Sequence, residues 1–319
     1  MSSPRAPGVT VVIPTKDGWP AAARTIECAL AQRDVEVEVV VVDDGSAERS
    51  AEALRSWAAG RMTVVRHDEP RGPAAARNVG LALARAPWTA FLDHDDLWSP
   101  DKLRAQLDAA AEVEAGFAFC AAITVDEQLR PIRYDPAPAT EGLLADLLKH
   151  DSIPGGCSNV IARTDLLREL GGFDEELFYL ADWDLWMRLA RASSPARVPE
   201  VHVAYVEHEG GLHLSGAHRG LAELKYMRGK HRVLWEPLGV DMGGRAWFPL
   251  WFAGGVLRSG RRLRSIALYL RIAFEYRSPG ALVRAALAPF SDRLARRDLA
   301  SDPSITDEDL PDWLLGLRA

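Results

Sequence analysis

The chain has 319 residues, of which 48% are hydrophobic and 26% charged, and its formal net charge is −7. This length is enough to bury a substantial core, in one large domain or two ordinary ones. The negative charge argues against general nucleic-acid binding, so we expect no nucleic-acid partner. Three widely spaced cysteines without a CxxC pair fit a reducing compartment and predict no zinc site.

Two terminal features bear on localisation. No apolar segment follows the first five residues before strand-like sequence begins, so we expect no secretory signal. The longest strongly apolar run near the C-terminus, residues 246–257, contains Pro249 and is too short to span a bilayer. We therefore expect a cytoplasmic protein, with peripheral contact at the inner face of the membrane left open.

Strands and helices alternate along the first hundred residues. Apolar, β-branched runs predict strands, and Ala- and Leu-rich stretches with helical spacing predict helices. The strands are expected at 9–13, 35–42, 62–65 and 89–92, and the helices at 21–32, 48–58 and 73–84. Apolar strands that alternate with helices predict an α/β fold with a mostly parallel sheet, in which ligands collect beyond the carboxyl ends of the strands.

Beyond residue 100 the pattern loosens. Helices are expected at 102–114, 142–150 and 182–192, strands at 116–125 and 199–206, and mostly helix from 221 onward. Ser99, followed by Pro100, is expected to cap the first of these helices.

The expected strand at 89–92 ends at three carboxylates, Asp93, Asp95 and Asp96. Like charges this close are costly unless a cation lies among them. A divalent cation with oxygen ligands is the natural candidate, and such ions usually accompany phosphate groups. The alternative is an acidic turn that precedes a helix, and this is our interpretation for Asp96.

Polar residues also follow two other expected strands. Pro14, Thr15 and Asp17 follow the first, and Asp44 follows the second. If the site binds a nucleoside diphosphate, Pro14 and Thr15 could frame the ring, and Asp44 could accept a hydrogen bond from the base. The alternative is a plain turn in which Asp44 or Ser46 caps the next helix.

A bound diphosphate would need further charged partners. Asp93 and Asp95 would hold a metal ion that bridges the phosphates and neutralises the leaving diphosphate, a Lewis-acid role. Arg77 is expected on a helix and either contacts phosphate or ribose, or lies at the surface. One of the histidines near 202–218, such as His208, could complete the coordination of an ion such as Mn²⁺.

A second acidic segment begins the expected helix at 182–192. Asp182 is either an N-cap or a general base that takes a proton from an acceptor hydroxyl. Asp184 and Arg188 have the spacing of a pair along the helix. Trp183, if exposed beside the base, would be a sugar-stacking face, although tryptophan is more often core. Gly155 and Gly156 predict a loop with exposed backbone.

Six segments together resemble the family 2 glycosyltransferases of the GT-A fold. They occur in the family's order within residues 8 to 215 and are VVIPT (11–15), VVDDGS (41–46), GPAAARN (72–78), FLDHDDL (91–97), GGFDE (171–175) and ADWDLW (181–186). The resemblance implies a Rossmann-like GT-A sheet. It also implies transfer of one sugar from a UDP-, dTDP- or GDP-sugar to a hydroxyl of a glycan, a lipid-linked acceptor or a small molecule, with inversion at the anomeric carbon.

The resemblance also assigns residues. It implies a catalytic base, a metal site for Mn²⁺ or Mg²⁺, a nucleotide-sugar site and an acceptor side. The base is Asp182; the metal ligands are Asp95, Asp93 and His208; the nucleotide-sugar residues are Pro14, Thr15, Asp17, Asp44, Arg77, Asp93 and His94; the acceptor side has Gly155, Gly156 and Trp183.

Two positions depart from the family pattern. Ala181 stands where a glutamate often precedes the base, so a helper carboxylate is absent. The segment around His208 matches loosely, which leaves His213 as an alternative ligand. The chain also lacks the Gln-x-x-Arg-Trp motif of processive synthases, so we expect transfer of a single sugar.

The C-terminal part has its own charge pattern. We expect a catalytic domain at 1–217 and a helical region at 218–319. Residues 243–297 carry 11 arginines and two acids, whereas 298–312 carry six acids and no base. The basic part predicts peripheral contact with an anionic membrane or with another subunit, including a homo-oligomer, against the alternative of a helical cap on the catalytic domain. The acidic part either folds against the basic helices or stays disordered.

Other functional classes fit less well. A sugar-1-phosphate nucleotidyltransferase would carry a Gly-rich loop where Pro14 and Thr15 stand, and a dinucleotide oxidoreductase would need GxGxxG after a strand. A catalytically inactive nucleotide-binding or scaffold protein of the same fold is the remaining alternative. The retention of Asp93, Asp95 and Asp182 argues against it.

Overall fold

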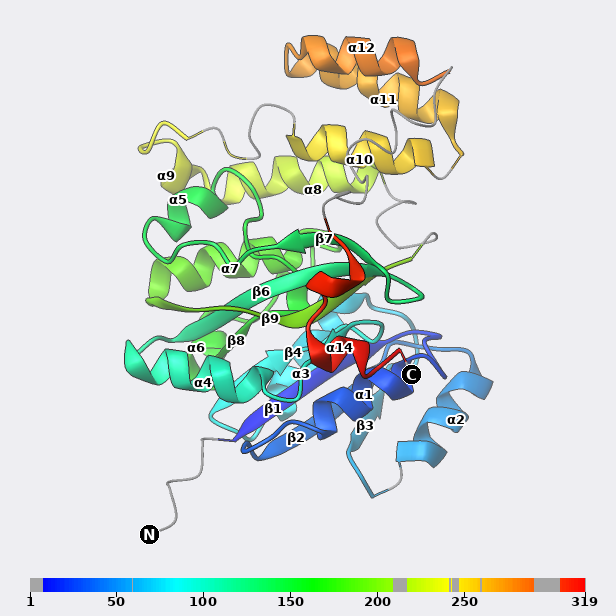
Figure 1. The fold of residues 1–319 in the computed structure, drawn as a ribbon. Coiled ribbons are helices and arrows are strands. Elements are labelled where there is room, and N and C mark those ends of the chain that lie inside the picture. Colours follow the sequence, from blue (N-terminus) through cyan, green and yellow to red (C-terminus); the bar gives the residue numbers. More distant parts are fainter. Residues whose placement is uncertain are drawn as a thin grey trace.

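The structure is a computed structural model, and it describes residues 8–58, 60–208, 217–240, 242, 247–258, 260–289 and 305–318. It is a mixed α/β protein with a curled, mostly parallel sheet and flanking helices (Figure 1). The alternation of strands and helices that the sequence predicts is confirmed, with most elements close to their expected bounds.

In the described part of the chain the sheet runs in the order β3-β2-β1-β4-β8-β6-β9-β5, and β7 pairs with β6. The strands are β1 (Val9–Thr15), β2 (Val37–Asp43), β3 (Thr63–Arg66), β4 (Trp88–Phe91), β5 (Leu97–Trp98), β6 (Phe117–Asp126), β7 (Pro131–Asp135), β8 (Ile161–Arg163) and β9 (Pro195–Glu207). Strands β1 to β4 pair in parallel, as do β6 and β9. The pairings of β4 with β8, β6 with β8, β6 with β7 and β5 with β9 are antiparallel.

The parallel register brings three strand ends to one edge of the sheet. Thr15 at the end of β1 lies opposite Asp43 at the end of β2. The amide of Leu92, just after β4, donates to the carbonyl of Val12. The polar residues that follow β1, β2 and β4 therefore emerge together, where α/β sheets bind their ligands.

Helices cover both faces of the sheet. They are α1 (Ala22–Leu30), α2 (Glu48–Ala58), α3 (Pro73–Leu83), α4 (Lys102–Glu112), α5 (Leu143–Leu147), α6 (Thr164–Glu169), α7 (Ala181–Ala192), α8 (Ala217–Lys230), α9 (Arg232–Trp235), α10 (Trp247–Arg258), α11 (Arg262–Glu275), α12 (Pro279–Leu287) and α14 (Asp312–Leu315), with 3-10 helices η1 (Gly156–Ser158) and η3 (Asp307–Asp309). Successive β1 residues point to opposite faces: Val12 packs in one core, whereas Val11 and Ile13 pack in the other, which α1 and α4 cover.

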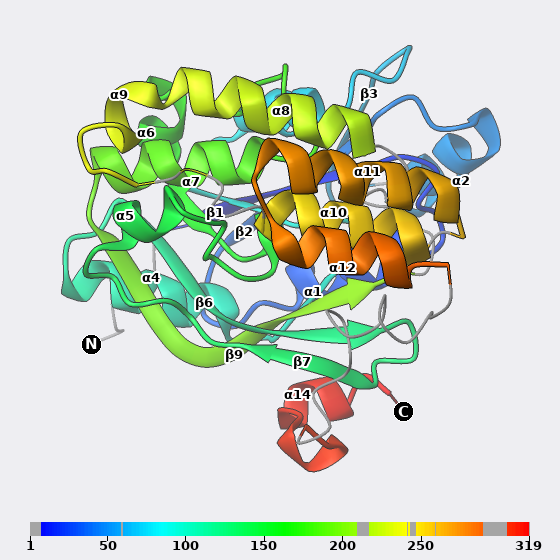
Figure 2. The ribbon, with the colours of Figure 1, turned by 90° about the horizontal axis from the view of Figure 1, so that it is seen from above.

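The C-terminal helices extend one of these cores. Helices α8 and α10 to α12 are stacked on the side of α7 that faces away from the sheet (Figures 1 and 2). Phe252 of α10 and Tyr269 of α11 belong to the same buried cluster as Trp186 of α7. Within the described residues, no helix combines the length and the apolar character needed to cross a bilayer.

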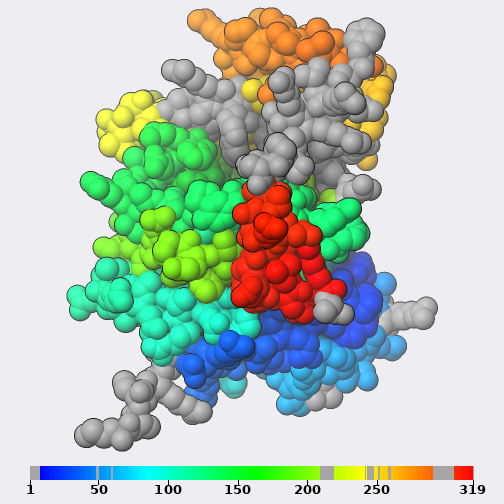
Figure 3. All heavy atoms as spheres, viewed as in Figure 1, coloured from blue at the N-terminus to red at the C-terminus, as the bar shows by residue number. Residues whose placement is uncertain are grey.

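The end of the chain returns to the α/β part of the molecule. Residues 305–318 lie across its surface, as the red segment of Figure 3 shows. Leu314 is fully buried there, and the indole Nε1 of Trp313 donates to the carbonyl of Val201 in β9 at 3.1 Å. The described part of the acidic stretch, 305–312, is therefore ordered, and it does not fold against the basic helices as one alternative predicted. Residues 298–304 lie outside the described ranges.

Some expectations were incomplete or wrong. The sequence did not predict β5, β7, β8 or α6, which are too short to show a period. Ser99 does not cap α4, which begins at Lys102. Instead the Ser99 hydroxyl pairs with His202 Nδ1 at 2.6 Å, because β5 pairs with β9 at this point.

Candidate functional site

The loops after β1 and β2 are joined by hydrogen bonds. The amide of Asp44 donates to the carbonyl of Thr15 at 2.8 Å. Asp17, with a left-handed φ of 51°, accepts the Ala47 amide at 2.7 Å, and its own amide donates to Ser46 Oγ at 2.8 Å. The residue before α2, Ala47, therefore donates its amide to a side chain from the β1 loop.

Asp44 also fixes the loop that precedes α3. Its carboxylate accepts the backbone amides of Arg71 and Gly72, each at 2.8 Å, and lies 2.7 Å from Nδ1 of His67. Its side chain is only 8% exposed. Because a carboxylate has about four acceptor positions, about one remains for a ligand.

The residues around the β1 end are tightly packed. Pro14 is buried in β1 opposite Val42. Thr15 Oγ1 is buried and has no hydrogen-bond partner among the described residues. His94 packs on Gly18, where an added Cβ would come within 2.3 Å of the imidazole Cδ2. A side chain at Gly18 would therefore displace His94 from this wall.

The three carboxylates after β4 have three different environments. Asp93 forms an ion pair with Arg77. Asp95 Oδ2 lies 3.2 Å from His208 Nε2. Asp96 is fully buried and accepts the Ser158 hydroxyl at 2.5 Å and the Val206 amide at 2.9 Å. Asp93 and Asp95 thus lie at the site, whereas Asp96 belongs to the fold.

These contacts shift the pKa values of His208, Asp95 and Asp96. The hydrogen bond to Asp95, together with the nearby Glu127 carboxylate, raises the pKa of His208 to about 9. Burial opposes ionisation of Asp95, but the hydrogen bond from His208 and the charges of His94 and His208 together outweigh it and lower the pKa of Asp95. Burial and the charges of Asp95 and Asp93 raise the pKa of Asp96 well above its usual range.

Asp95 and His208 fit a divalent cation. Two ligands bound at about 2.1 Å and at a right angle are about 3 Å apart, close to the 3.2 Å between Asp95 Oδ2 and His208 Nε2. Within the described residues no three His, Cys, Asp or Glu side chains converge to hold an ion by themselves. An ion here would therefore need further ligands, such as phosphate oxygens or water. His213, the alternative ligand, lies outside the described residues.

Arg77 links the strand end to the second acidic segment. Its guanidinium is buried, it pairs with Asp93, and it lies over the ring of Phe173, 5.4 Å from the ring centroid. Burial opposes the charge, but the fields of Asp93 and of Asp182 raise the pKa of Arg77. Arg77 is thus not a surface residue, and it brings the two acidic segments into one site.

Asp182 lies in the first turn of α7. The residue before the helix, Leu180, has no capping side chain, and Asp182 Oδ1 accepts the amide of Trp183 at 2.8 Å. The turn at Gly155 and Gly156 has positive φ angles of 71° and 52°, and a Cβ on Gly156 would lie 3.3 Å from Asp182 Oδ2. The glycine turn predicted from the sequence therefore lies against Asp182.

Trp183 is not the stacking surface that an exposed indole would provide. It is 1% exposed, and its Nε1 donates to the carbonyl of Leu147 at 2.6 Å. Its place on α7, one residue after Asp182, points it away from the site and into the core. We therefore remove Trp183 from the acceptor side.

The sequence predicted no role for two residues near Asp182, namely Asp151 and Ser152. Asp151 Oδ1 and Ser152 Oγ are buried and lack hydrogen-bond partners among the described residues. Burial, and then the charge of Asp182, raise the pKa of Asp151 well above its usual range. The helper carboxylate missing at Ala181 thus has a counterpart on another segment. No motif marks Asp151, and only its proximity to the glycine turn could have suggested it.

Asp184, two residues after Asp182, has a structural role. Its carboxylate is fully buried and lies 2.7 Å from Arg188, 2.8 Å from Lys230 and 2.7 Å from His231. The pair with Arg188 that the sequence predicts is confirmed. Burial opposes its charge, but the hydrogen bond from His231 and the two cations lower the pKa of Asp184 to about 2.

Comparisons with known proteins bear on the family and the fold of the chain. A family model described as "Glycosyl transferase family 2" matches residues 10–171, slightly more than half of the chain. The chain is 32% identical to "Succinoglycan biosynthesis protein ExoU" of Rhizobium meliloti (strain 1021), over 66% of this chain and 65% of that protein. It is 30% identical to "Pre-mycofactocin glycosyltransferase" of Mycobacterium tuberculosis (strain ATCC 25618 / H37Rv), over 65% of this chain and 44% of that one. The chain thus spans less than two thirds of these relatives.

Solved structures resemble the whole fold. The mannosyltransferase PcManGT from Pyrobaculum calidifontis, in complex with GDP-Man and Mn²⁺, superposes with a TM-score of 0.55 at 21% identity, covering 89% of this chain and 79% of that one. Residues 1–349 of S. aureus TarS, in complex with UDP-GlcNAc, superpose with a TM-score of 0.54 at 19% identity, covering 88% and 89%. At these identities the likeness shows the fold.

Proposed function

This chain belongs to glycosyl transferase family 2, and on that premise we propose that it moves one sugar from a nucleoside-diphosphate sugar to an acceptor hydroxyl, with inversion at the anomeric carbon. The reaction is metal-assisted, and Asp182 is the general base. The single observation that carries this proposal is that buried Arg77 pairs with Asp93 and lies in the field of Asp182, although these carboxylates are far apart in the sequence.

The donor lies along the edge formed by β1, β2 and β4. Pro14, Thr15 and Asp17 line the nucleotide. Thr15 Oγ1, which is buried and has no hydrogen-bond partner among the described residues, can hydrogen-bond to it. Asp44 reads the base with its remaining acceptor position and fixes the loop beside it. His94 closes this side through its packing on Gly18.

The diphosphate lies near Arg77, Asp93 and Asp95. Asp95 and His208, which lie 3.2 Å apart, would hold a Mn²⁺ or Mg²⁺ ion, and Asp93 would contribute the oxygen that does not pair with Arg77. When bound, the ion supplies positive charge that offsets the charge developing on the diphosphate. The Arg77 guanidinium provides a second, fixed positive charge on this side of the sugar.

The acceptor approaches from the glycine turn. Its hydroxyl oxygen bonds to the anomeric carbon as the bond from that carbon to the diphosphate oxygen breaks, and its proton passes to the Asp182 carboxylate. Gly156 leaves room beside Asp182 because it carries no Cβ, and Gly155 precedes it in the same turn. Asp151 and Ser152 offer two buried oxygens to orient an incoming hydroxyl.

The donor is identified by a binding panel. Thermal shift and calorimetry with UDP-, dTDP- and GDP-sugars and their diphosphates, with Mn²⁺, Mg²⁺ or a chelator, should give one preferred base and metal-dependent binding. Turnover is measured as release of nucleoside diphosphate with a panel of hydroxyl acceptors.

Two outcomes would contradict the proposal. Binding that is the same with a chelator as with Mn²⁺ would remove the metal from the site. Metal-dependent donor binding without release of nucleoside diphosphate, even by slow hydrolysis to water, would favour a catalytically inactive member of the family.

A further inference from the structure

Helix α11 has apolar side chains on two opposite sides. Leu268, Tyr269 and Ile272 are buried against the rest of the protein. On the other side, Leu263 is 84% exposed, Leu270 50% and Phe274 88%. These three positions have i, i+7 and i+11 spacing and therefore form one stripe along the helix, opposite the buried side.

Helix α12 enlarges this apolar surface. It packs against α11 as the outermost layer of the molecule, farthest from the sheet (Figures 1 and 2). Leu282 is 53% exposed, Val283 57% and Leu287 36%. We call the six exposed side chains of α11 and α12 the outer apolar stripe. Large exposed apolar side chains gathered on two packed helices are typical of a contact with a partner or a membrane.

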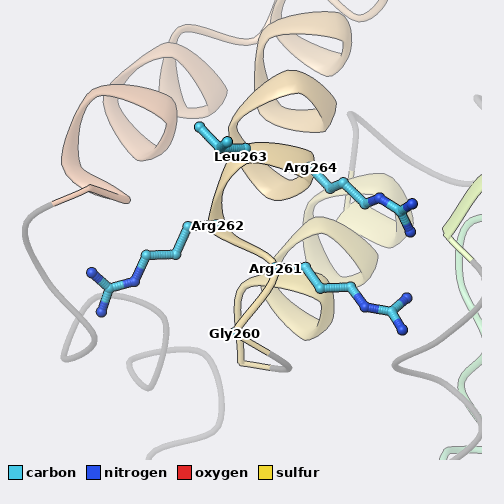
Figure 4. Close-up of a pocket in the computed structure, with 5 residues that line it drawn as sticks. All are labelled: Gly260, Arg261, Arg262, Leu263 and Arg264. Atoms are coloured by element: carbon cyan, nitrogen blue, oxygen red, sulfur yellow. The ribbon is translucent and has the colours of Figure 1, made fainter.

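Arginines border the outer apolar stripe. Residues 247–258 and 260–289 contain a single acidic residue, Glu275, and it pairs with Arg271 at 2.7 Å. The arginines of 260–289 are Arg261, Arg262, Arg264, Arg271, Arg277 and Arg284. Figure 4 shows the start of α11, where Arg261 and Arg264 point to one side of Leu263 and Arg262 to the other, around a shallow hollow.

This hollow is not part of the transfer site. Gly260 and residues 261–264 line it at the start of α11, whereas Asp95 follows β4 and Asp182 lies in the first turn of α7. The surface therefore has a separate role from the transfer chemistry.

We propose that the outer apolar stripe of α11 and α12 rests on an anionic lipid surface, with its bordering arginines at the level of the lipid phosphates. An interfacial helix has this pattern, with leucine and phenylalanine inserted and cationic side chains beside them. Arginine suits the contact because its planar guanidinium binds phosphate in a bidentate manner. Each cation close to an anionic leaflet adds to the attraction.

Charge also argues against a second copy of the chain as the occupant. A twofold contact through this surface would place the same patch against itself. Six arginines would then face six arginines, with Glu275 already paired in each copy. Like charges facing one another are costly, so the self-contact is disfavoured.

Vesicle flotation of the full-length protein tests the proposal. With vesicles of 30% phosphatidylglycerol in phosphatidylcholine we expect the protein to float at low salt. We expect weak flotation with phosphatidylcholine alone and a loss of binding in high salt, because salt screens the arginines. No flotation with the anionic vesicles would overturn the proposal.

Variants assign the binding to this surface. Leu263→Ser with Phe274→Ser should weaken anionic-vesicle binding by at least about tenfold, since the two most exposed apolar side chains of the stripe are removed. The matched control is Val233→Ser with Leu238→Ser, which changes two apolar side chains that are 73% and 57% exposed on and beside α9. Equal binding by the two double variants would contradict the assignment.

A second pair of variants tests how much the arginines contribute to vesicle binding. Arg261→Gln with Arg264→Gln should weaken binding by about 30-fold at low salt, whereas the control Arg33→Gln with Lys149→Gln removes two exposed cations elsewhere and should leave it within about twofold. Sedimentation of the protein without lipid is measured in parallel. Self-association that Leu263→Ser with Phe274→Ser abolishes would show a second copy on the stripe and overturn the proposal. Donor binding, measured on the same variants, should not change.

Discussion

The acidic segment after β4 and the acidic segment at the start of α7 are built alike. Each places one carboxylate at the site and another in the core, one or two residues apart. After β4, Asp95 faces His208 while Asp96 is buried. On α7, Asp182 lies beside the glycine turn while Asp184 is buried.

The two buried carboxylates differ in their partners. Asp96 accepts a serine hydroxyl and a backbone amide, and burial raises its pKa. Asp184 lies against Arg188, Lys230 and His231, and its pKa is lowered to about 2 despite burial. A buried carboxylate stays charged only where cations replace the lost water. The difference shows that the role of each acidic residue in a motif depends on the groups that contact its own carboxylate.

The largest expected effect separates Asp182 from Asp184 by activity. Asp182→Asn should lower kcat by about 10²–10⁴-fold, since an amide cannot take the acceptor's proton. Donor binding should stay within about twofold. Steady-state kinetics and calorimetry check both, with Asp165→Asn, an exposed residue paired with Arg163, as the control. Retained turnover would refute Asp182 as the base.

The corresponding change on the strand end is Asp95→Ala. It should abolish the effect of Mn²⁺ on donor binding and lower kcat by about 10²–10³-fold, because His208 and the single free oxygen of Asp93 would hold the ion too weakly. Calorimetric titration of UDP and GDP with and without metal measures it. Asp101→Ala, which removes an exposed carboxylate, is the control. An unchanged metal response would exclude Asp95 from the metal site.

Asp184→Asn should instead act on stability. It should lower the free energy of unfolding by about 3–5 kcal/mol, because Arg188 and Lys230 lose their buried counter-charge. Urea unfolding measures the loss, and Asp146→Asn, which removes an exposed pair with Lys149, should cost less than about 1 kcal/mol. If Asp182→Asn proves the less stable variant, the division of roles on α7 is wrong.

The same carboxylate predicts the pH dependence of stability. The pKa of Asp184 is about 2 in the folded protein, below the value of about 3.9 in an unfolded chain. Its contribution is therefore complete above pH about 4 and is lost as the pH falls toward 2, in total on the order of 2 kcal/mol. The difference in unfolding free energy between wild type and Asp184→Asn should shrink by about this amount over this range. A constant difference would contradict the lowered pKa.

The smallest expected effect concerns Asp44. Asp44→Ala should reduce discrimination among UDP, dTDP and GDP by about 2–10-fold, the contribution of one hydrogen bond, and leave the metal response unchanged. Competition binding with the three diphosphates measures it. Increased amide hydrogen exchange at Arg71 and Gly72 should accompany the change, because both amides lose their acceptor. Unaltered base preference would leave Asp44 with its structural role alone.

Much of the fold followed from the sequence. The valine-rich runs of β1 and β2 and the alanine-rich α3 have clear periods, so these elements and the polar strand ends between them could be predicted. The strands β5, β7 and β8 could not, since they are short and owe their pairing to neighbours distant in sequence.

The sequence by itself determined which residue types stand at the ends of β1, β2 and β4 and at the start of α7, because local periodicity marks where those elements end. Only the tertiary structure decided which of these residues lie at the site and which are buried in the core. It buried Asp96, Asp184 and Trp183, brought Asp151 near Asp182, and packed residues 305–318 on the α/β part. These outcomes depend on which long-range partners supply hydrogen bonds and charge, and no local pattern of residues carries that information.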